Sequence, residues 1–182
     1  TKKMEKYGIP AIMMADGPHG LRCQKGETDM VGVNKSLPAT CFPAAVTAGA
    51  TWDEVLYAEE GAAIGQEGLA ANVPLILGPG CNIKRNPLGG RNFEYLSEDP
   101  YAAGKMAAAF IRGMQSTGAS ASLKHFAANS QEYKRMNGDS QMDERTLREI
   151  YLSAFELAVR ESHPATVMCA YNKINGEHCS DS

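Results

Sequence analysis

Residues 119–126, Ala-Ser-Ala-Ser-Leu-Lys-His-Phe, form a short apolar run whose end carries a lysine and a histidine. Three comparable runs lie at residues 9–15, 73–77 and 165–170. Short, nearly continuous apolar runs that are bounded by turn residues are typical of strands buried on both faces. The sequence therefore predicts four buried strands.

Helical periodicity separates the four runs. Thr51 with Glu54 forms a capping-box pattern at the start of the first predicted helix. Asp99 and Pro100 begin the second helix, and the third spans roughly residues 143–161. The residues expected on the buried sides are Trp52, Val55, Leu56 and Ala63 in the first helix, Ala103, Met106, Ala107, Phe110, Ile111 and Met114 in the second, and Leu147, Ile150, Tyr151, Ala154 and Ala158 in the third.

This alternation of strand and helix predicts an α/β fold in which three crossovers join four parallel strands. On the pattern alone, a doubly wound sheet and a part of a (β/α)8 barrel both stay open. The loops that enter the strands are short, whereas the loops that leave them hold charged residues and glycines. Ligands of α/β folds bind at the carboxyl ends of strands, so we expect the functional site there.

The composition is that of a globular domain. The chain has 182 residues, 43% of them apolar, with 18 Lys plus Arg against 21 Asp plus Glu and a formal charge of −3. This balance offers no general attraction to nucleic acid or to anionic lipid, so neither is an expected partner. No stretch approaches the roughly 18 apolar residues that a membrane span needs, and no membrane partner is expected.

The cysteines bear on the compartment. Their odd number, five, and the lack of a CxxC pair favour free thiols in a cytoplasmic protein, and leftover pairing in a secreted protein is the alternative. The chain begins at Thr1, so we expect the native N-terminus to be absent, and the lack of a visible signal peptide decides little. Adjacent His178 and Cys179 lack the spacing of zinc ligands, and residues 78–80 (Gly-Pro-Gly) lack the third glycine of a dinucleotide fingerprint. No metal and no cofactor are expected.

Candidate binding residues follow the strands. Asp16 is either a turn former or a carboxylate that accepts hydrogen bonds from two hydroxyls, and Arg91, after two glycines, is either a solvated loop arginine or a fork for vicinal hydroxyls. Lys124 and His125 end an apolar strand, where their burial needs polar partners, so they favour a polar pocket.

Two more candidates lie on later loops. Arg135 lies on the loop after His125, together with Asp139, and Tyr171 offers an apolar face and a hydroxyl after the fourth strand. The chain has no GxSxG elbow, no Walker loop and no HExxH helix. The set therefore suits a site for a carbohydrate or another small polar ligand.

Five motifs carry a resemblance to a known family. They are residues 16–22 (Asp-Gly-Pro-His-Gly-Leu-Arg), 82–94 (Asn-Ile-Lys-Arg-Asn-Pro-Leu-Gly-Gly-Arg-Asn-Phe-Glu), 97–100 (Ser-Glu-Asp-Pro), 124–129 (Lys-His-Phe-Ala-Ala-Asn) and 168–172 (Met-Cys-Ala-Tyr-Asn). In this order they resemble the N-terminal barrel domain of glycoside hydrolase family 3, in its β-glucosidase-like branch. The resemblance implies the barrel rather than the doubly wound sheet.

The resemblance also implies roles. Asp16 would hold the distal hydroxyls of the non-reducing sugar, and Arg91, Lys124 and His125 would bind its ring hydroxyls with help from Arg135. Tyr171 would lie beside the nucleophile, Met168 would form an apolar wall, and Arg22 is a weaker candidate. The loop at residues 126–132 (Phe-Ala-Ala-Asn-Ser-Gln-Glu) differs from that of the family's N-acetylglucosaminidases, which disfavours that activity.

The family's catalytic pair is not expected here. Retaining glycosidases use two carboxylates about 5 Å apart. The family's nucleophilic Asp follows a later strand and its acid/base Glu usually comes from the next domain, so both are expected beyond Ser182. Asp181 has no apolar strand before it, and Glu94, Glu98 and Asp99 are interpreted as loop support and helix capping. No residue of the chain is therefore assigned as catalytic.

The resemblance changes the meaning of the length. Residues 1–182 hold four strand–helix units, and an average barrel has roughly 250 residues, so the chain is expected to be about the first half of the barrel. The rest of the barrel and a second domain are the expected partners. The implied activity is exo-hydrolysis of β-glucosides with retention, with a β-xylosidase, another exo-glycosidase of the family or a non-catalytic sugar-binding protein as alternatives.

Overall fold

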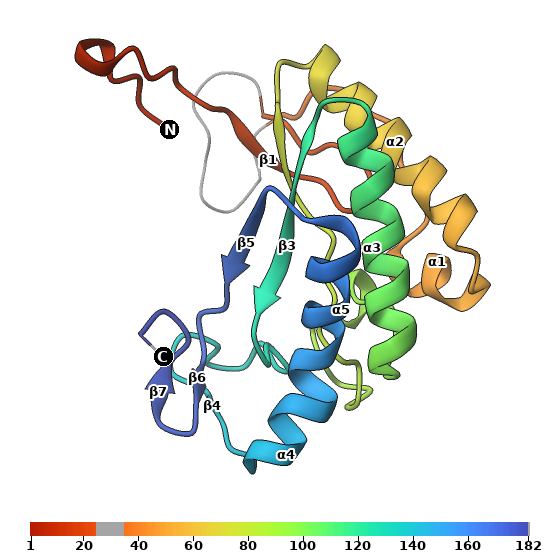
Figure 1. Ribbon diagram of the computed structural model, residues 1–182, viewed down its shortest axis with the longest axis vertical. Coiled ribbons are helices and arrows are strands. Elements are labelled where there is room, and N and C mark those ends of the chain that lie inside the picture. The colour runs from red at the N-terminus through yellow and green to blue at the C-terminus, as the bar shows by residue number, and fades with distance from the viewer. Residues whose placement is uncertain (25–34, 182) are drawn as a thin grey trace.

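Four parallel strands lie side by side in the computed structural model, which describes residues 1–24 and 35–181 (Figure 1). They are β1 (Met14–Asp16), β2 (Leu75–Leu77), β3 (Ser120–Phe126) and β5 (Thr166–Cys169). Their order in the sheet is β1-β2-β3-β5, the same as their order in the chain. The four predicted strands, their parallel pairing and the three crossovers are therefore confirmed.

The helices lie on one side of this sheet (Figure 1). They are α1 (Ala45–Thr51), α2 (Glu54–Ala70), α3 (Pro100–Ser116), α4 (Glu144–Thr146), a π-helical turn (Leu147–Leu152) and α5 (Ser153–Ser162), with short 3-10 turns at Glu5–Tyr7 and Asn92–Glu94. A doubly wound sheet reverses its strand order and carries helices on both faces. This sheet does neither, so the architecture is part of a (β/α)8 barrel.

A small second sheet follows β3 and β5. It contains β4 (Asp139–Ser140), β6 (Lys173–Ile174) and β7 (Glu177–His178), in the order β4-β6-β7. The sequence does not predict this sheet, because strands of two residues are too short to show a period. Asn175, on the turn between β6 and β7, links this turn to the segment after β4. Its side-chain oxygen accepts a hydrogen bond from the Met142 N–H at 3.0 Å, and its side-chain nitrogen donates to the Met142 carbonyl at 2.9 Å.

The first predicted strand is shorter and more exposed than expected. Only Ala15 is buried among residues 9–15, and pairing begins at Met14. The prediction of burial on both faces is therefore wrong for most of this run. The physical reason is that β1 is an edge strand of the described sheet, with β2 as its neighbour on one side only.

The first predicted helix is two helices. Asp53 caps α2, because its carboxylate accepts hydrogen bonds from the N–H groups of Val55 and Leu56, both at 3.0 Å. Thr51 instead ends α1, where its hydroxyl donates to the carbonyl of Ala48 at 2.6 Å. The expected Thr51–Glu54 capping box is therefore wrong, and the cap lies two residues later.

The buried stripe of α2 is also not the predicted one. Trp52, Val55 and Leu56 are exposed by 78%, 70% and 50%, and Ala63 is only partly buried. The face that packs inward holds Tyr57, Gly61, Ile64, Gly65 and Gly68. Three of these five residues are glycines, which have no apolar side chain and do not contribute to a hydrophobic pattern. The apolar spacing in the sequence therefore predicts the wrong buried face for α2.

Glycines let α2 and α3 pack backbone against backbone. A Cβ on Gly61 would overlap the carbonyl oxygen of Phe110, and a Cβ on Gly113 would overlap the carbonyl oxygen of Ala58. This contact is the most extensive between any two elements of the described fold. It fixes the helical layer against which β2 and β3 lie.

The second and third predicted helices are confirmed. The Asp99 carboxylate accepts a hydrogen bond from the Ala102 N–H at 2.8 Å, and all six residues predicted on the buried side of α3 are buried. Asp143 caps the third helix through the Thr146 N–H at 2.7 Å. Ala154 and Ala158 are buried, whereas Leu147, Ile150 and Tyr151 are partly buried.

Two further expectations concern the whole chain. All five cysteines, Cys23, Cys41, Cys81, Cys169 and Cys179, are free thiols. Among the helices of the described residues, none is both long and apolar enough to cross a membrane.

The contact between α2 and α3 gives a stability prediction. We expect Gly113→Ala to lower the free energy of unfolding of the protein that contains this chain by at least about 2 kcal/mol, because the added methyl meets a backbone carbonyl that cannot rotate away. Gly138→Ala is the matched control, since its Cβ would meet no atom closer than 3.5 Å. Equal unfolding midpoints in urea for the two variants would contradict this packing.

Candidate functional site

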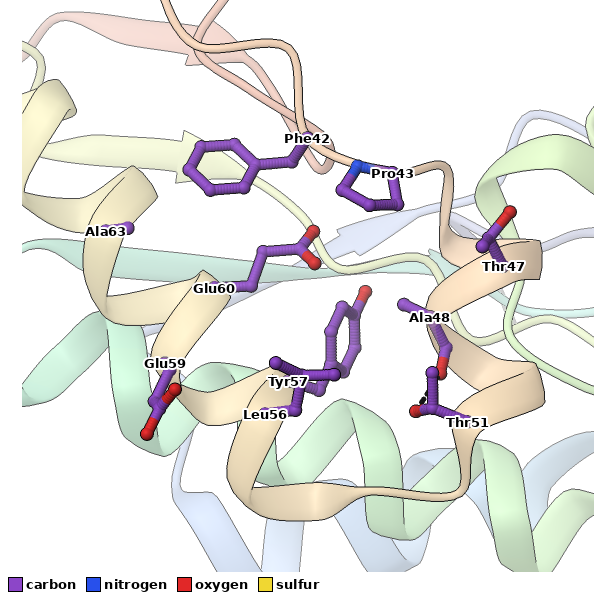
Figure 2. A pocket seen from close by; sticks show the side chains of 10 residues that line it. All are labelled: Phe42, Pro43, Thr47, Ala48, Thr51, Leu56, Tyr57, Glu59, Glu60 and Ala63. Atoms are coloured by element: carbon purple, nitrogen blue, oxygen red, sulfur yellow. Dashed lines mark hydrogen bonds between the residues drawn. The ribbon is translucent and has the colours of Figure 1, made fainter.

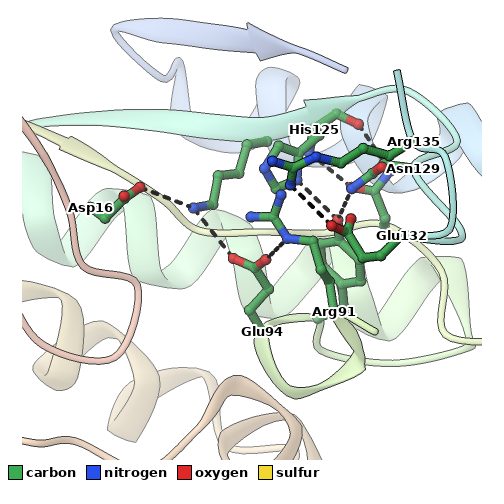
Figure 3. A network of polar contacts seen from close by, with 10 residues as sticks. Asp16, Arg91, Glu94, His125, Asn129, Glu132 and Arg135 are labelled. Atoms are coloured by element: carbon green, nitrogen blue, oxygen red, sulfur yellow. Dashed lines mark hydrogen bonds and ion pairs between the residues drawn. The ribbon is translucent and has the colours of Figure 1, made fainter. Parts of the chain in front are cut away.

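A pocket of about 460 Å³ lies at the carboxyl ends of the strands. Its walls come from the ends of β1 and β3 and from the loops that follow β1, β2 and β3. Four of the residues predicted for the site line it, namely Asp16, Arg91, Lys124 and Arg135, and so does Arg22, the weaker candidate. Residues that are 119 positions apart in the chain thus meet in one place (Figure 3).

Lys124 is the centre of the charged network. Its side chain is 3% exposed, and its ammonium lies 3.3 Å from Glu94 Oε2 and 3.9 Å from Asp16 Oδ1. A buried charge is tolerated only when it is paired. Three strand ends therefore contribute to one ion-pair network, in which Lys124 is the shared cation.

Glu94 joins the two basic residues from the second and third loops. Its other carboxylate oxygen accepts a hydrogen bond from Arg91 Nε, so this buried side chain lies between the Arg91 guanidinium and the Lys124 ammonium. From the sequence, Glu94 is expected only to support its loop. The structure corrects this, because the carboxylate is part of the pocket wall and orients two predicted binding residues.

Backbone contacts fix the loop after β2 against the end of β3. The Lys124 N–H donates to the Pro79 carbonyl at 3.0 Å, and the Cys81 N–H donates to the Lys124 carbonyl at 2.9 Å. Gly80 lets the later part of the same loop pack against this segment, since a Cβ there would lie 2.8 Å from the Tyr95 ring. The Gly-Pro-Gly segment therefore has a structural role that brings Arg91 and Glu94 to the site.

His125 lies just beneath the pocket and is buried. Its Nδ1 is 2.9 Å from the Tyr95 hydroxyl, which also accepts a hydrogen bond from Asn129 Nδ2 at 2.7 Å. We assign the tyrosine proton to the bond with Nδ1, which makes the imidazole neutral and puts its own proton on Nε2. Burial, reinforced by the charges of Arg91, Lys124 and Arg135, lowers the pKa of His125 to about 2.

The remaining predicted residues lie around the pocket. Arg135 pairs with Glu132 Oε2 at 3.0 Å, and its guanidinium lies 5.2 Å from the centre of the Tyr171 ring. Met168 is the register partner of Lys124 on β5. Neither Tyr171 nor Met168 is among the described residues that line the pocket.

Several lining residues carried no prediction. His19, Phe93 and Glu132 line the pocket, while Tyr95 and Asn129 orient His125 from beneath. His19 is one of these residues. Its ring packs edge-on against Phe93 at 5.8 Å, and burial lowers its pKa, opposed by Glu94 and assisted by Lys124. One signal in the sequence could have identified Glu94 and Glu132 as site residues. The predicted basic residues Arg91, Lys124 and Arg135 need carboxylates close to them if they are buried.

The arrangement is suited to binding hydroxyl groups. Asp16 presents a carboxylate that is 58% exposed and pairs with Lys124 only at 3.9 Å, whereas the other two carboxylates of the pocket, Glu94 and Glu132, form closer ion pairs with basic side chains. Donors and one accessible acceptor thus surround the same space. Among residues 1–24 and 35–181, no group of three or more side chains could hold a metal ion.

The chain matches a model of the Glycosyl hydrolase family 3 N terminal domain over residues 1–182. It is 57% identical over 182 residues to the thermostable beta-glucosidase B of Acetivibrio thermocellus, an alignment that covers all of this chain and 24% of that protein. It is 50% identical over 183 residues to an exo-alpha-(1->6)-L-arabinopyranosidase of Bifidobacterium longum, which covers 98% of this chain and 24% of that protein.

Solved structures of beta-glucosidases are also similar to this chain. Beta-glucosidase 3B from Thermotoga neapolitana, in complex with alpha-D-glucose, is similar with a TM-score of 0.91 and 48% identity over 99% of this chain and 25% of that one. Beta-glucosidase from Kluyveromyces marxianus gives a TM-score of 0.92 and 45% identity over 99% of this chain and 21% of that one. The chain thus spans about a quarter of the length of the curated relatives named above.

The buried ion pair gives a second prediction. We expect Lys124→Met to lower the free energy of unfolding by about 3–5 kcal/mol, because it leaves Glu94 buried beside a single cation. Adding Glu94→Gln should then cost less than the same change in the wild-type background, with a coupling of at least about 1 kcal/mol. Arg160→Met, at an exposed pair with Glu156, is the control and should cost less than about 1 kcal/mol. Additive effects of the two site changes would contradict the pairing.

The neutral imidazole gives a pH prediction. In the unfolded chain His125 takes up a proton below a pH of about 6.5, whereas in the folded protein it stays neutral down to a pH of about 2. Its contribution to stability is therefore complete above a pH of about 6.5 and falls as the pH decreases, by up to about 1.4 kcal/mol per unit. Between pH 6.5 and 4.5, the wild type should lose about 2 kcal/mol more unfolding free energy than His125→Gln in urea titrations. Parallel pH profiles would refute the neutral, buried state.

Proposed function

The chain belongs to glycosyl hydrolase family 3, whose N-terminal domain it matches over residues 1–182. We propose that the protein containing this chain is a retaining exo-glycosidase of the β-glucosidase type. The observation that carries the proposal is the ion-pair network at the strand ends, where Lys124, Arg91 and the accessible Asp16 carboxylate meet around one pocket. A neutral sugar offers each of these groups a hydroxyl partner. Fixed donors and acceptors of this kind orient a sugar without any large net charge.

In this proposal the chain supplies the binding site for the non-reducing sugar. Asp16 accepts hydrogen bonds from the distal hydroxyls, and Arg91 and Lys124 donate to ring hydroxyls. The Nε2–H of His125 is a further donor, and Arg135 binds from the next loop. Because Glu94 and Tyr95 already hold these side chains in place, little ordering cost remains when the sugar binds.

The bond-breaking groups belong, in this proposal, to sequence beyond residue 182. A retaining reaction needs one carboxylate that attacks the anomeric carbon and one that protonates the leaving oxygen, about 5 Å apart. Glu94 is neutralised by two cations and Glu132 pairs with Arg135, so neither suits either role. Tyr171 would then lie beside the attacking carboxylate, and Met168 would form an apolar wall.

We also propose that residues 1–182 are about the first half of the barrel. The strand β5 ends the described sheet on one side, and a groove of about 520 Å³ beside it is lined by Phe126, Phe155 and Val167, among others. An open parallel edge with apolar side chains next to it is unusual in a finished α/β sheet. A further strand and helix of the same protein would cover both.

A second candidate is an exo-glycosidase that acts on a pentopyranoside. It is favoured by the 50% identity to the exo-alpha-(1->6)-L-arabinopyranosidase of Bifidobacterium longum. A pentopyranose lacks the hydroxymethyl group of glucose, so the two candidates differ in how the pocket treats that end of the sugar.

A substrate panel tests the proposed function. The protein that contains this chain should hydrolyse 4-nitrophenyl β-glucoside with a kcat/KM at least about tenfold above that for the β-xyloside and α-L-arabinopyranoside, because one lost hydroxyl contact corresponds to roughly that factor. Preference for a pentopyranoside would support the second candidate. Binding of glucose without turnover of any of the three glycosides would indicate a non-catalytic sugar-binding protein.

Asp16 is the most direct probe of the sugar contacts. Asp16→Ala should lower kcat/KM by roughly 10²–10³-fold, because it removes a charged acceptor of two hydrogen bonds that tighten in the transition state. Its stability should change little, since Lys124 keeps Glu94 as its closer partner. Glu177→Gln, at an exposed carboxylate on β7, is the control and should retain full activity. Unchanged activity of Asp16→Ala would rule out this mode of binding.

A further inference from the structure

A second pocket lies between α1 and α2, on the helical side of the sheet (Figure 2). Its volume is about 330 Å³, and none of its lining residues also lines the pocket at the strand ends. Most of its wall is hydrocarbon, from Phe42, Pro43, Ala48, Leu56 and Ala63. The volume lies at the lower end of the range of small-molecule sites.

Two polar groups inside this apolar wall have no partner. The Tyr57 side chain is buried, with 1% of the residue exposed, and neither its hydroxyl nor Glu60 Oε1 has a hydrogen-bond partner within the part of the chain that the structure describes. Figure 2 shows the hydroxyl and the carboxylate pointing into the same space. Nearly all buried polar groups in proteins are hydrogen-bonded, so two orphaned atoms facing one pocket point to a ligand.

The protonation of the two groups narrows the ligand chemistry. Burial raises the pKa of Glu60 to about 7, and burial together with Glu60 raises the pKa of Tyr57 far above its usual range. The tyrosine is therefore a neutral O–H that needs an acceptor, while near pH 7 the Glu60 carboxyl is present in both its acidic and its ionised form and can either donate to a ligand or accept from it. One hydroxyl group can serve both side chains, because it accepts and donates at the same time.

We propose that this pocket binds a small apolar alcohol, whose hydroxyl accepts a hydrogen bond from Tyr57 and donates one to Glu60 Oε1. Its hydrocarbon part packs against Phe42, Leu56 and Ala63. An ammonium head can only donate and leaves the Tyr57 proton unpaired, and a pure hydrocarbon leaves both polar atoms unpaired. The alcohol is therefore the ligand class that the wall and the two polar atoms accept together.

This pocket is a neighbour of the strand-end pocket along the chain. Cys41 lines the strand-end pocket and Phe42 lines this one, while the Phe42 N–H donates to the carbonyl of His19 at 2.9 Å. Activity is therefore a poor readout for the second pocket, because a ligand there touches a segment bonded to the first. Binding has to be measured directly, and the proposal does not rest on the glycosidase assignment.

The test uses the protein that contains this chain and three probes of one size, benzyl alcohol, toluene and benzylamine. Dissociation constants come from titrations followed by NMR at pH 7. Benzyl alcohol should bind at least about tenfold more tightly than toluene, the factor that one or two buried hydrogen bonds supply, and also more tightly than benzylamine.

Two variants test whether the probes bind in this pocket. Tyr57→Phe removes an unpartnered hydroxyl, so it should fold normally and should lose the advantage of benzyl alcohol over toluene. Ala63→Leu fills the space and should weaken both probes by about tenfold or more. Tyr133→Phe, at a tyrosine that is 75% exposed, is the matched control and should change neither the dissociation constant of benzyl alcohol nor that of toluene.

Three results would overturn the proposal. The first is equal or tighter binding of toluene, and the second is tighter binding of benzylamine, which would indicate a site for a cation. The third is no binding of benzyl alcohol at millimolar concentration, which would mean that another part of the protein covers the pocket.

Discussion

The buried ammonium of Lys124 is the constraint on which the rest of the site depends. A charge that is 3% exposed near the end of β3 requires carboxylates within a few ångströms. The chain supplies them through Asp16 at the end of β1 and Glu94 on the loop that follows β2. Parallel pairing makes this possible, because it brings the carboxyl ends of β1, β2 and β3 to the same edge. The loop that carries Arg91 is then positioned by this network, through the hydrogen bond from Arg91 Nε to Glu94.

The strand-end pocket and the pocket between α1 and α2 represent opposite physical situations. At the strand ends, Glu94 pairs with both Arg91 and Lys124. The more exposed Asp16 carboxylate faces the pocket and can accept further hydrogen bonds. Between α1 and α2, an apolar wall holds two polar atoms with no partner in the described chain. The first arrangement suits a ligand rich in hydroxyls, and the second suits a ligand that is mostly hydrocarbon with a single hydroxyl.

Much of the fold could be predicted where a local interaction decides the structure. Asp99 and Pro100 mark the start of α3, and its apolar spacing identifies the buried face correctly. The prediction failed at α2, where Gly61 packs against the Phe110 carbonyl and no apolar side chain signals the contact. It also failed at β1, since burial of an edge strand depends on neighbours and not on its own sequence.

The candidate site shows the same division. Asp16, Arg91, Lys124 and Arg135 could be predicted because polar residues after parallel strands gather at one edge, and the family motifs supported them. Glu94 was missed as a pocket residue because its importance comes from pairing across loops, and His19 because a loop histidine has no local signature.

A crystal structure of the protein that contains this chain, with bound glucose, tests the central claim most directly. The account predicts glucose in the strand-end pocket, with its hydroxyls within hydrogen-bond distance of the Asp16 carboxylate, the Lys124 ammonium and the Arg91 guanidinium. Glucose bound elsewhere, with these three side chains contacting only one another, would contradict it.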